Sequence, residues 1–296
     1  MPLKITKADQ PIIVQNLTMC LYAPPGLGKT SMAFTAEKPI LFDFDKGSHR
    51  SQFRKDTVQI DSWSEVEGVT ADDLAPYETI IIDTAGRALD ALASDLMKKN
   101  PKFKGYGGQL SLQGFGALKA GFAGWLNLMR SFGKDVILIA HMDEQRNGDD
   151  TVERLDIQGG SKNEIYKLAD AMGRIRFDGQ RKVLDFNPSA SGFGKNPGQL
   201  PPVDVVNFTT APDFLAGVIS EIKSALNRQS EEAMAAQAAL MELRESLMAL
   251  ESPEQFTKAA EDMAKSPDKE KAVLMAVAKQ KGYHYDKSAK AFTEAA

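Results

Sequence analysis

LYAPPGLGKTSMAF, residues 21–34, is the most informative segment of the chain. An apolar run ends at Ala23, two prolines and two glycines follow, and a helix-like segment begins after a lysine and a threonine. Gly26 and Gly28 let backbone N–H groups turn inward around phosphate oxygens, where a side chain would obstruct them. The start of the helix behind them adds partial positive charge. The spacing predicts a P-loop, with alanine where the first glycine of that motif stands.

The P-loop residues have separate roles at a nucleotide. Lys29 can reach the β- and γ-phosphates, and the Thr30 hydroxyl can ligate Mg²⁺. We therefore expect ATP and Mg²⁺ as cofactors. The residues expected to contact the nucleotide are Pro25, Gly26, Leu27, Gly28, Lys29, Thr30 and Ser31. The alternative is a plain glycine-rich turn, which the strand and helix context on its two sides disfavours.

A second apolar strand, ETIIIDTAG at residues 78–86, ends in an acid. Three consecutive isoleucines are typical of a parallel strand buried on both faces. Asp83 stands at the carboxyl end of that strand, where a carboxylate that orders a metal ion belongs. Thr84 follows in place of glutamate, so no base comes directly after the metal-ordering acid. The Asp-Thr-Ala-Gly run also matches a GTPase switch, but the Asn-Lys-x-Asp motif that reads guanine is absent from the sequence.

A candidate base lies upstream, in PILFDFDKG at residues 39–47. Asp43 and Asp45 are two residues apart, so on one strand their side chains would share a face and point at one spot beside the P-loop. One of them can orient or deprotonate a water for attack on the γ-phosphate. Asp45 is the preferred candidate and Asp43 the reserve. The alternative is two acids that cap a strand end before a Lys-Gly turn.

A third strand, DVILIAH at residues 135–141, ends in a histidine. His141 would lie where this strand runs out toward the nucleotide. A γ-phosphate sensor must hydrogen-bond the terminal phosphate and lose that bond after hydrolysis, which a histidine can do. A purely structural histidine is the alternative. The predicted catalytic residues are Lys29, Asp45, Asp83 and His141, and the predicted metal ligands are Thr30 and Asp83.

Together these segments resemble RecA-type ATPases. LYAPPGLGKTS, PILFDFDKG, ETIIIDTAGRALD and VILIAH are similar to segments of the phage-encoded RecA-like proteins associated with single-strand annealing and recombination. The resemblance covers residues 12–226. It implies an α/β fold with a mostly parallel central sheet flanked by helices, ATP hydrolysis at subunit interfaces, and a homo-oligomer that forms a ring or a filament. In that group the second strand ends Asp-x-Glu, whereas this chain carries the shorter Asp45.

A basic stretch with interleaved aromatic residues follows the Asp83 strand: KKNPKFKGYGGQLSLQGFGALK, residues 98–119. From Asp95 to Lys119 five positive charges face one negative charge, on a chain whose net charge is 36 − 40 = −4. Lysines bind phosphates through counterion release, and aromatic faces stack on bases. The resemblance implies that this loop binds single-stranded DNA; a flexible loop or a subunit contact is the alternative. The residues expected at the DNA are Lys98, Lys99, Lys102, Phe103, Lys104 and Tyr106.

Another glycine-bracketed loop, SASGFGKNPG at residues 189–198, carries Lys195 at its expected tip. RecA-type assemblies bring a basic residue from a neighbouring subunit to the γ-phosphate. Lys195 resembles that trans-acting finger, with Arg181 in reserve. A solvated turn lysine is the alternative.

The chain changes character after Leu226. Glycine nearly disappears, and alanine, glutamate, lysine and methionine dominate, which is typical of helices. Two Ser-Pro pairs, at 252–253 and 266–267, match an N-cap followed by proline at the first helical position. They predict helices over 252–265 and 267–281. We expect a RecA-like ATP-binding domain at 1–226 and a small helical C-terminal region at 227–296.

The composition of the chain further restricts the class of protein and its compartment. The chain is 43% hydrophobic and 26% charged, as ordinary globular proteins are. Cys20 is the single cysteine, which excludes an internal disulfide and fits a reducing compartment. No window approaches the roughly 18–20 apolar residues of a membrane span. These features predict a cytoplasmic protein, in the host cell if phage-encoded, with no membrane partner.

Three functions fit these patterns. The preferred one is an ATP-hydrolysing DNA recombination protein that binds single-stranded DNA and promotes strand annealing or exchange. Its candidate partners are a single-strand-binding protein and other recombination proteins. The alternatives are a RecA-type helicase or motor, and a nucleotide-switched DNA-binding protein with little hydrolysis. An AAA+ helicase loader is disfavoured, because Thr84 stands where such a loader carries an acid.

Overall fold

The computed structural model describes residues 3, 5–8, 10–147, 150–157 and 160–294. By its internal contacts the chain divides into two compact units. One is Val14–Leu226, and the other groups Asn227–Ala296 with Met1–Ile13.

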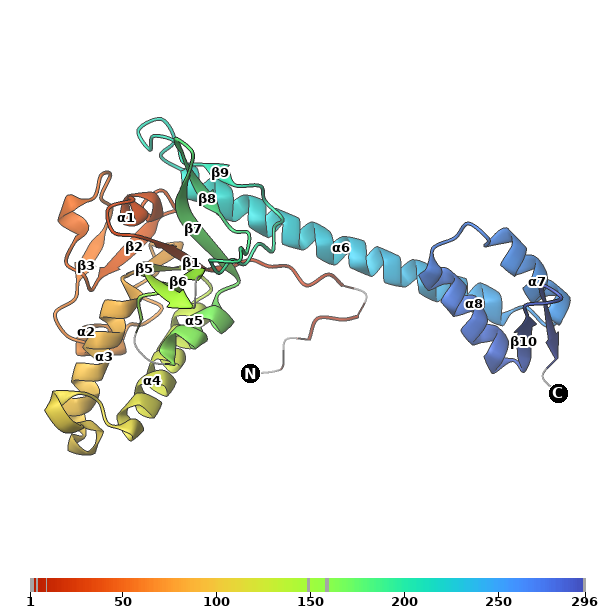
Figure 1. Ribbon diagram of the computed structural model, residues 1–296, viewed down its shortest axis with the longest axis horizontal. Helices are drawn as coiled ribbons and strands as arrows, with labels where there is room; N and C mark the ends of the chain where they lie inside the picture. The colour runs from red at the N-terminus through yellow and green to blue at the C-terminus, as the bar shows by residue number, and fades with distance from the viewer. Residues whose placement is uncertain (1–2, 4, 9, 148–149, 158–159, 295–296) are drawn as a thin grey trace. The chain divides into compact units, whose positions relative to one another are not determined.

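A mostly parallel sheet forms the centre of the first unit (Figure 1). Its strands run in the order β3-β2-β4-β5-β1-β7-β8-β9, and β6 pairs with the outer half of β5. All neighbours from β3 to β7 are parallel, whereas β8, β9 and β6 are added antiparallel. The strands are β1 (Thr18–Ala23), β2 (Pro39–Asp43), β3 (Thr57–Gln59), β4 (Thr79–Asp83), β5 (Asp135–Asn147), β6 (Asp150–Leu155), β7 (Ala171–Asp178), β8 (Arg181–Asp185) and β9 (Val203–Asp204).

Helices cover both faces of this sheet. The helices are α1 (Lys29–Ala33), α2 (Ser64–Glu67), α3 (Ala85–Lys99), α4 (Leu112–Ser131), α5 (Ser161–Leu168) and the part of α6 (Phe214–Met248) up to Leu226, with 3₁₀ turns η1 (Ser48–Arg50), η2 (Pro101–Phe103) and η3 (Tyr106–Gly108). Because neighbouring side chains of a strand point to opposite faces, Ile80 and Ile82 pack with α3 and α4, while Ile81 packs with α1 and α6. The predicted α/β class, with a parallel sheet buried on both faces, is confirmed.

Strand order brings the predicted site segments together. β5 lies between β1 and β4, and β2 lies beyond β4. The register pairs Ala23 with His141, Ile139 with Asp83, and Asp83 with Asp43. The carboxyl ends of β1, β2 and β4 therefore meet at one edge of the sheet, with His141 of β5 beside them, and this edge is where ligands bind in parallel α/β sheets. The strand predicted to end at His141 does not end there, because β5 continues to Asn147 and its outer half pairs with β6.

The second unit has a small core of its own. α7 (Pro253–Asp262) and α8 (Asp268–Gln280) confirm the two predicted helices, and Ser252 caps α7 with a capping box. The region is not wholly helical, because β10 (Tyr283–Asp286) and β11 (Ala291–Glu294) form an antiparallel hairpin after α8. The buried core residues are Leu247, Phe256, Leu274, Val277, Ala278 and Phe292. Leu243 and Leu250 pack against that core, so the leucines in the last turns of α6 and just after it are used within the unit.

Within the described part of the chain, no helix combines the length and the apolar character that a membrane crossing requires.

Candidate nucleotide-binding site

The P-loop has the backbone of a phosphate cradle. Gly26 and Gly28 have φ angles of 83° and 78°, in the left-handed region that side chains disfavour. A β-carbon on Gly26 would meet no atom within 4 Å, so conformation and not crowding requires glycine there. Gly28 is the N-cap of α1, and Lys29 begins the helix. The predicted strand, loop and helix are thus all present.

Lys29 is folded back against its own loop. Its ammonium donates to the carbonyl oxygens of Ala23 at 2.9 Å and Pro24 at 3.0 Å, and its Nζ lies 3.5 Å from Nδ1 of His141. Burial lowers the pKa of Lys29 to about 8, and the nearby carboxylates of Asp83 and Asp45 oppose that shift only in part. A phosphate beside the ammonium would stabilise its charged form.

Thr30 and Asp83 supply two adjacent oxygen donors. The Thr30 hydroxyl donates to Oδ2 of Asp83 at 2.6 Å. Burial raises the pKa of Asp83 to about 6, although the hydrogen bond from Thr30 opposes the shift. Hard oxygen donors of this kind fit Mg²⁺, which keeps most of its ligands as waters and phosphate oxygens. Within the described ranges no cluster of three or more His, Cys, Asp or Glu side chains could hold a metal ion by itself.

Asp43 and Asp45 have different surroundings, which corrects the expectation that both point at one spot. β2 ends at Asp43, whose side chain is fully buried and accepts hydrogen bonds from the backbone N–H groups of Gly47 at 3.2 Å and Ser48 at 3.1 Å. Its carboxylate therefore holds the turn after the strand. Asp45 lies in that turn and lines the cavity at the P-loop, together with Asp83. Asp45 is therefore the acid with access to a nucleotide.

Two arginines that the sequence did not indicate flank Asp45. Nε of Arg87 lies 3.5 Å from Oδ1 of Asp45, and an Nη of Arg50 lies 3.9 Å from its Oδ2. Arg87 stands on the first turn of α3 and also pairs with Asp90 at 3.2 Å. Arg87 reaches Asp45 only because β4 lies next to β2, whereas Arg50 lies in the 3₁₀ turn a few residues after Asp45.

His141 lies between Lys29 and the first turn of α3. Burial is the main cause that lowers its pKa, and the Lys29 ammonium adds to the shift. The ring is therefore neutral near pH 7. With the ammonium of Lys29 as donor, Nδ1 accepts and the ring proton is on Nε2, which is then available to a phosphate oxygen.

The P-loop cavity gathers most of the predicted residues. Its volume is about 420 Å³. The residues that line it are Pro25, Gly26, Gly28, Lys29, Thr30, Ser31, Asp45, Gly47, Arg50, Ser51, Asp83 and His141. The chain thus brings together the P-loop, both acids expected at the metal and the water, and the expected sensor.

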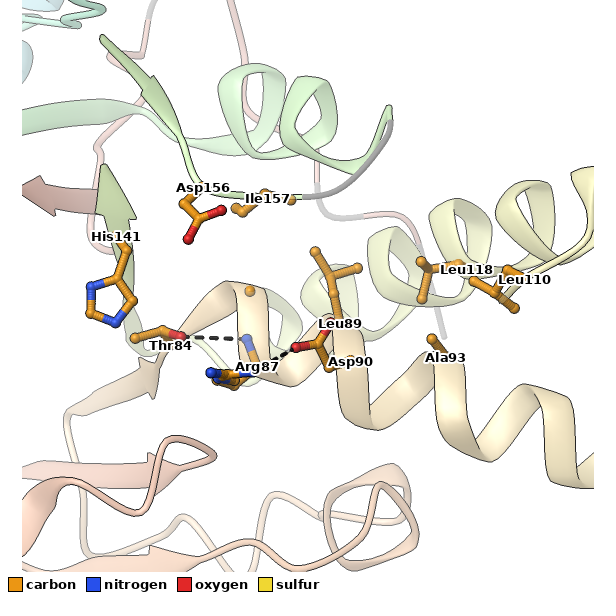
Figure 2. Close-up of a pocket in the computed structure, with 11 residues that line it drawn as sticks. Thr84, Arg87, Leu89, Asp90, Ala93, Leu110, Leu118, His141, Asp156 and Ile157 are labelled. Atoms are coloured by element: carbon orange, nitrogen blue, oxygen red, sulfur yellow. Dashed lines mark hydrogen bonds and ion pairs between the residues drawn. The ribbon is translucent and has the colours of Figure 1, made fainter. Parts of the chain in front are cut away.

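A second cavity, of about 250 Å³, begins on the other side of His141. Figure 2 shows His141, Thr84, Arg87 and Asp156 around one part of it and the apolar side chains of α3 and α4 around the other. Its lining extends to Leu110, which precedes α4. His141, the predicted sensor, therefore lines both the P-loop cavity and the cavity between α3 and α4.

The predicted DNA loop connects α3 to α4, and its lysines are not equivalent. Lys99 pairs with Glu67 at 2.8 Å and with Asp95 at 2.9 Å, so its charge is already neutralised within the chain. Tyr106 is fully exposed, whereas Phe103 is partly buried. Among the described residues, no ion pair engages the exposed side chains of Lys98, Lys102 and Lys104.

Lys195 does not stand at a free loop tip. Its backbone pairs with Met172, and its ammonium donates to the carbonyl of Ala169 at 2.7 Å. Arg181, the reserve candidate, is exposed and pairs with Asp178 at 3.1 Å and Asp204 at 3.4 Å. Both cations thus have contacts within the chain.

The fold and the site define a P-loop ATPase with an AAA/RecA-like core. A family model described as an AAA domain matches residues 15–197, and the chain belongs to that family. The crystal structure of a KaiC-like protein, PH0186, from the hyperthermophilic archaeon Pyrococcus horikoshii OT3 is similar, with 12% sequence identity and a TM-score of 0.33. The match covers 62% of this chain and 86% of that one. No curated protein sequence matches the chain.

Proposed function

We propose that the protein is an ATP-hydrolysing DNA recombination protein that binds single-stranded DNA and promotes strand annealing or exchange. The P-loop cavity supports the ATP part. The resemblance to phage-encoded RecA-like proteins of single-strand annealing supports the recombination part and a phage origin.

One helix carries the proposal, because α3 joins the two predicted functional regions. Thr84 caps α3 directly after Asp83, and its hydroxyl accepts from the backbone N–H of Arg87 at 3.4 Å. The helix ends at Lys99, next to the loop with the unpaired lysines and Tyr106. Its 15 residues span about 22 Å. A change at the phosphates and a change at the DNA can therefore each be transmitted along one rigid element.

The residues of the cavity suggest how hydrolysis proceeds. The P-loop amides and Lys29 hold the phosphates, and Mg²⁺ held near Thr30 and Asp83 supplies charge neutralisation at the transferred phosphoryl group. Asp45 orients the attacking water, and Arg87, whose Nε lies 3.5 Å from Oδ1 of Asp45, holds that carboxylate in place. His141 donates from Nε2 to the γ-phosphate, so loss of that phosphate removes the hydrogen bond and frees the ring.

We further propose that the active form is a homo-oligomer, a ring or a filament, in which a basic residue of a neighbour completes the ATP site. Lys195 stays the candidate for that residue. Its hydrogen bond to Ala169 would have to break on assembly, which makes its role testable by mixing variants. A single-strand-binding protein and other recombination proteins are the proposed partners.

ATP turnover with and without single-stranded DNA tests the proposal, with Lys29→Ala as the blank. Stimulation by DNA supports a DNA-dependent ATPase. Turnover that is above the blank but indifferent to DNA would remove the DNA part. An annealing assay with two complementary labelled strands then separates annealing from the strand displacement expected of a motor.

A nucleotide-switched DNA-binding protein is the second candidate, and Asp45 favours it. The aspartate is one methylene shorter than the glutamate of the RecA group, and two arginines flank its carboxylate. Turnover at the level of the blank, combined with ATP-dependent binding of single-stranded DNA, would select this candidate over the enzyme.

A further inference from the structure

Lys182 stands beside the P-loop, far from it in the sequence. A β-carbon placed on Gly28 would lie 3.5 Å from Nζ of Lys182. Lys182 is on β8, which pairs antiparallel with β7 so that Lys182 lies opposite Phe177. β7 runs parallel to β1 and continues past the register of its last residue, Ala23. The outer part of the β7–β8 hairpin therefore rises next to the P-loop.

Within the described part of the chain, the ammonium of Lys182 has no counter-ion, unlike its cationic neighbours on the hairpin. Arg181 pairs with Asp178 and Asp204, and Arg176 pairs with Asp185 at 2.9 Å. No carboxylate within the described ranges forms an ion pair with Lys182. Lys182 is half-buried, and burial alone lowers its pKa. A half-buried cation with no partner is costly, and an anion beside it would offset that cost.

Strand order fixes the side from which Lys182 approaches. β5 and β4, which carry His141 and Asp83, lie on one side of β1, whereas β7 and β8 lie on the other. The ammonium of Lys29 is directed toward His141. Gly28 thus has a cation on each side. Lys29 is on the side of the predicted γ-phosphate, and Lys182 is on the opposite side.

We propose that Lys182 is a second cation of the phosphate site, which binds the α- or β-phosphate of a nucleotide held by the P-loop of the same chain. The inference rests on the nucleotide-binding part of the proposed function and is independent of its DNA part. Because Lys182 approaches from the side away from Asp83 and His141, it contacts phosphates that ATP and ADP share.

Titration of fluorescent ATP and ADP analogues into the full-length protein tests this assignment. Lys182→Ala should raise the Kd for both nucleotides by a similar factor, about tenfold, since hydrogen bonds to charged groups are the stronger ones. Lys182→Arg should restore most of the affinity. Lys134→Ala is the matched control, because Lys134 is also half-buried but precedes β5 at the opposite edge of the sheet.

Unchanged affinity of Lys182→Ala, next to nucleotide binding by the wild type, would overturn the inference and leave the proposed function intact. Weakening of ATP but not ADP would overturn the placement at the shared phosphates. Failure of the wild type to bind either nucleotide would overturn the inference and the proposed function together. Circular dichroism of each variant confirms that the hairpin substitution leaves the fold unchanged.

Mixing variants tests whether Lys182 acts within its own chain. Lys182→Ala protein is mixed with Lys29→Ala protein, which retains Lys182 but has a defective P-loop. Restored high-affinity binding would mean that Lys182 reaches a neighbour's nucleotide, and would overturn the assignment within one chain. Affinity equal to that of Lys182→Ala alone supports it.

Discussion

The P-loop cavity and the loop between α3 and α4 are built in opposite ways. In the cavity, Lys29, Thr30 and Asp83 are buried or half-buried and contact one another or their own backbone. In the loop, Lys102, Lys104 and Tyr106 are exposed. The first region is organised before any ligand binds, whereas the second leaves its charges and an aromatic face exposed to solvent. A motif with fixed spacing encodes the first; local composition encodes the second.

Lys29→Ala should have the largest effect, because it removes the cation at the centre of the organised region. We expect nucleotide binding or turnover to be abolished, as measured by phosphate release and by binding of a fluorescent ATP analogue. Lys134→Ala serves as the control. Wild-type hydrolysis by Lys29→Ala would show that the P-loop is not the site.

Substitution of Asp45 should mainly lower turnover, whereas substitution of Asp43 should mainly lower stability. Asp45→Asn should lower turnover about 100-fold or more, since it removes the group that orients the water, while the melting temperature stays near that of the wild type. Asp43→Asn should cost about 1–3 kcal/mol of unfolding free energy, because the buried carboxylate accepts two backbone N–H groups.

Phosphate release and thermal unfolding of both variants check this contrast. An Asp43→Asn protein of normal stability with no turnover would reverse the assignment of the two acids. Asp45→Glu sharpens the test, because it introduces the longer carboxylate of the RecA group. Faster turnover by Asp45→Glu would indicate that the short side chain limits hydrolysis.

Charge reversal in the loop should weaken DNA binding and leave the organised region unaffected. Lys102→Glu combined with Lys104→Glu should lower affinity for single-stranded DNA about 30-fold at low salt and reduce the slope of log K against log salt by about 1–2. Turnover without DNA should not change. Fluorescence anisotropy of a labelled oligonucleotide at several salt concentrations measures both quantities.

The matched control carries the same change of charge elsewhere. Arg54→Glu with Lys55→Glu reverses two exposed cations just before β3. If that pair weakens DNA binding as much as the loop pair does, net charge and not the loop accounts for the effect.

The pH dependence of nucleotide binding should show the smallest effect, a decline of up to about tenfold per pH unit on either side of a plateau. The Lys29 ammonium has a pKa of about 8, so above that pH binding must take up a proton and the affinity falls. Asp83 has a pKa of about 6, so below that pH its carboxylate is protonated and Mg²⁺-dependent affinity falls. Titrations from pH 5 to 9 test this; a flat profile above pH 8 would contradict the assignment to Lys29.

Local patterns were sufficient for the residues that stand on single strands. The P-loop spacing and the isoleucine run before Asp83 each predict their element, and the apolar run before His141 predicts the inner half of β5, which continues to Asn147. Parallel strands bring these segments to one edge of the sheet. The predicted spot shared by Asp43 and Asp45 was wrong, because β2 ends at Asp43 and the period of two does not continue through the turn.

Local sequence patterns do not predict contacts between segments that are distant in the chain. Arg87 and Lys182 stand next to site residues only because β4 neighbours β2 and because the β7–β8 hairpin extends past β1. The β10–β11 hairpin had a local signal, since Tyr283, Tyr285 and Phe292 favour strands, but the helical composition of the region outweighed it. Lys99 resembled its neighbours in the loop until the structure placed Glu67 beside it.

The length of α3 determines how far a small rotation at its first residue moves its last residue. A rigid rod of about 22 Å whose base is the cap next to Asp83 amplifies small rotations, so a tilt of about 10° at Thr84 displaces the far end by about 4 Å. Such a displacement is comparable to the spacing of stacked bases. If the proposed function holds, the helix would relate an ångström-scale event at a phosphate to a step along a nucleic acid strand.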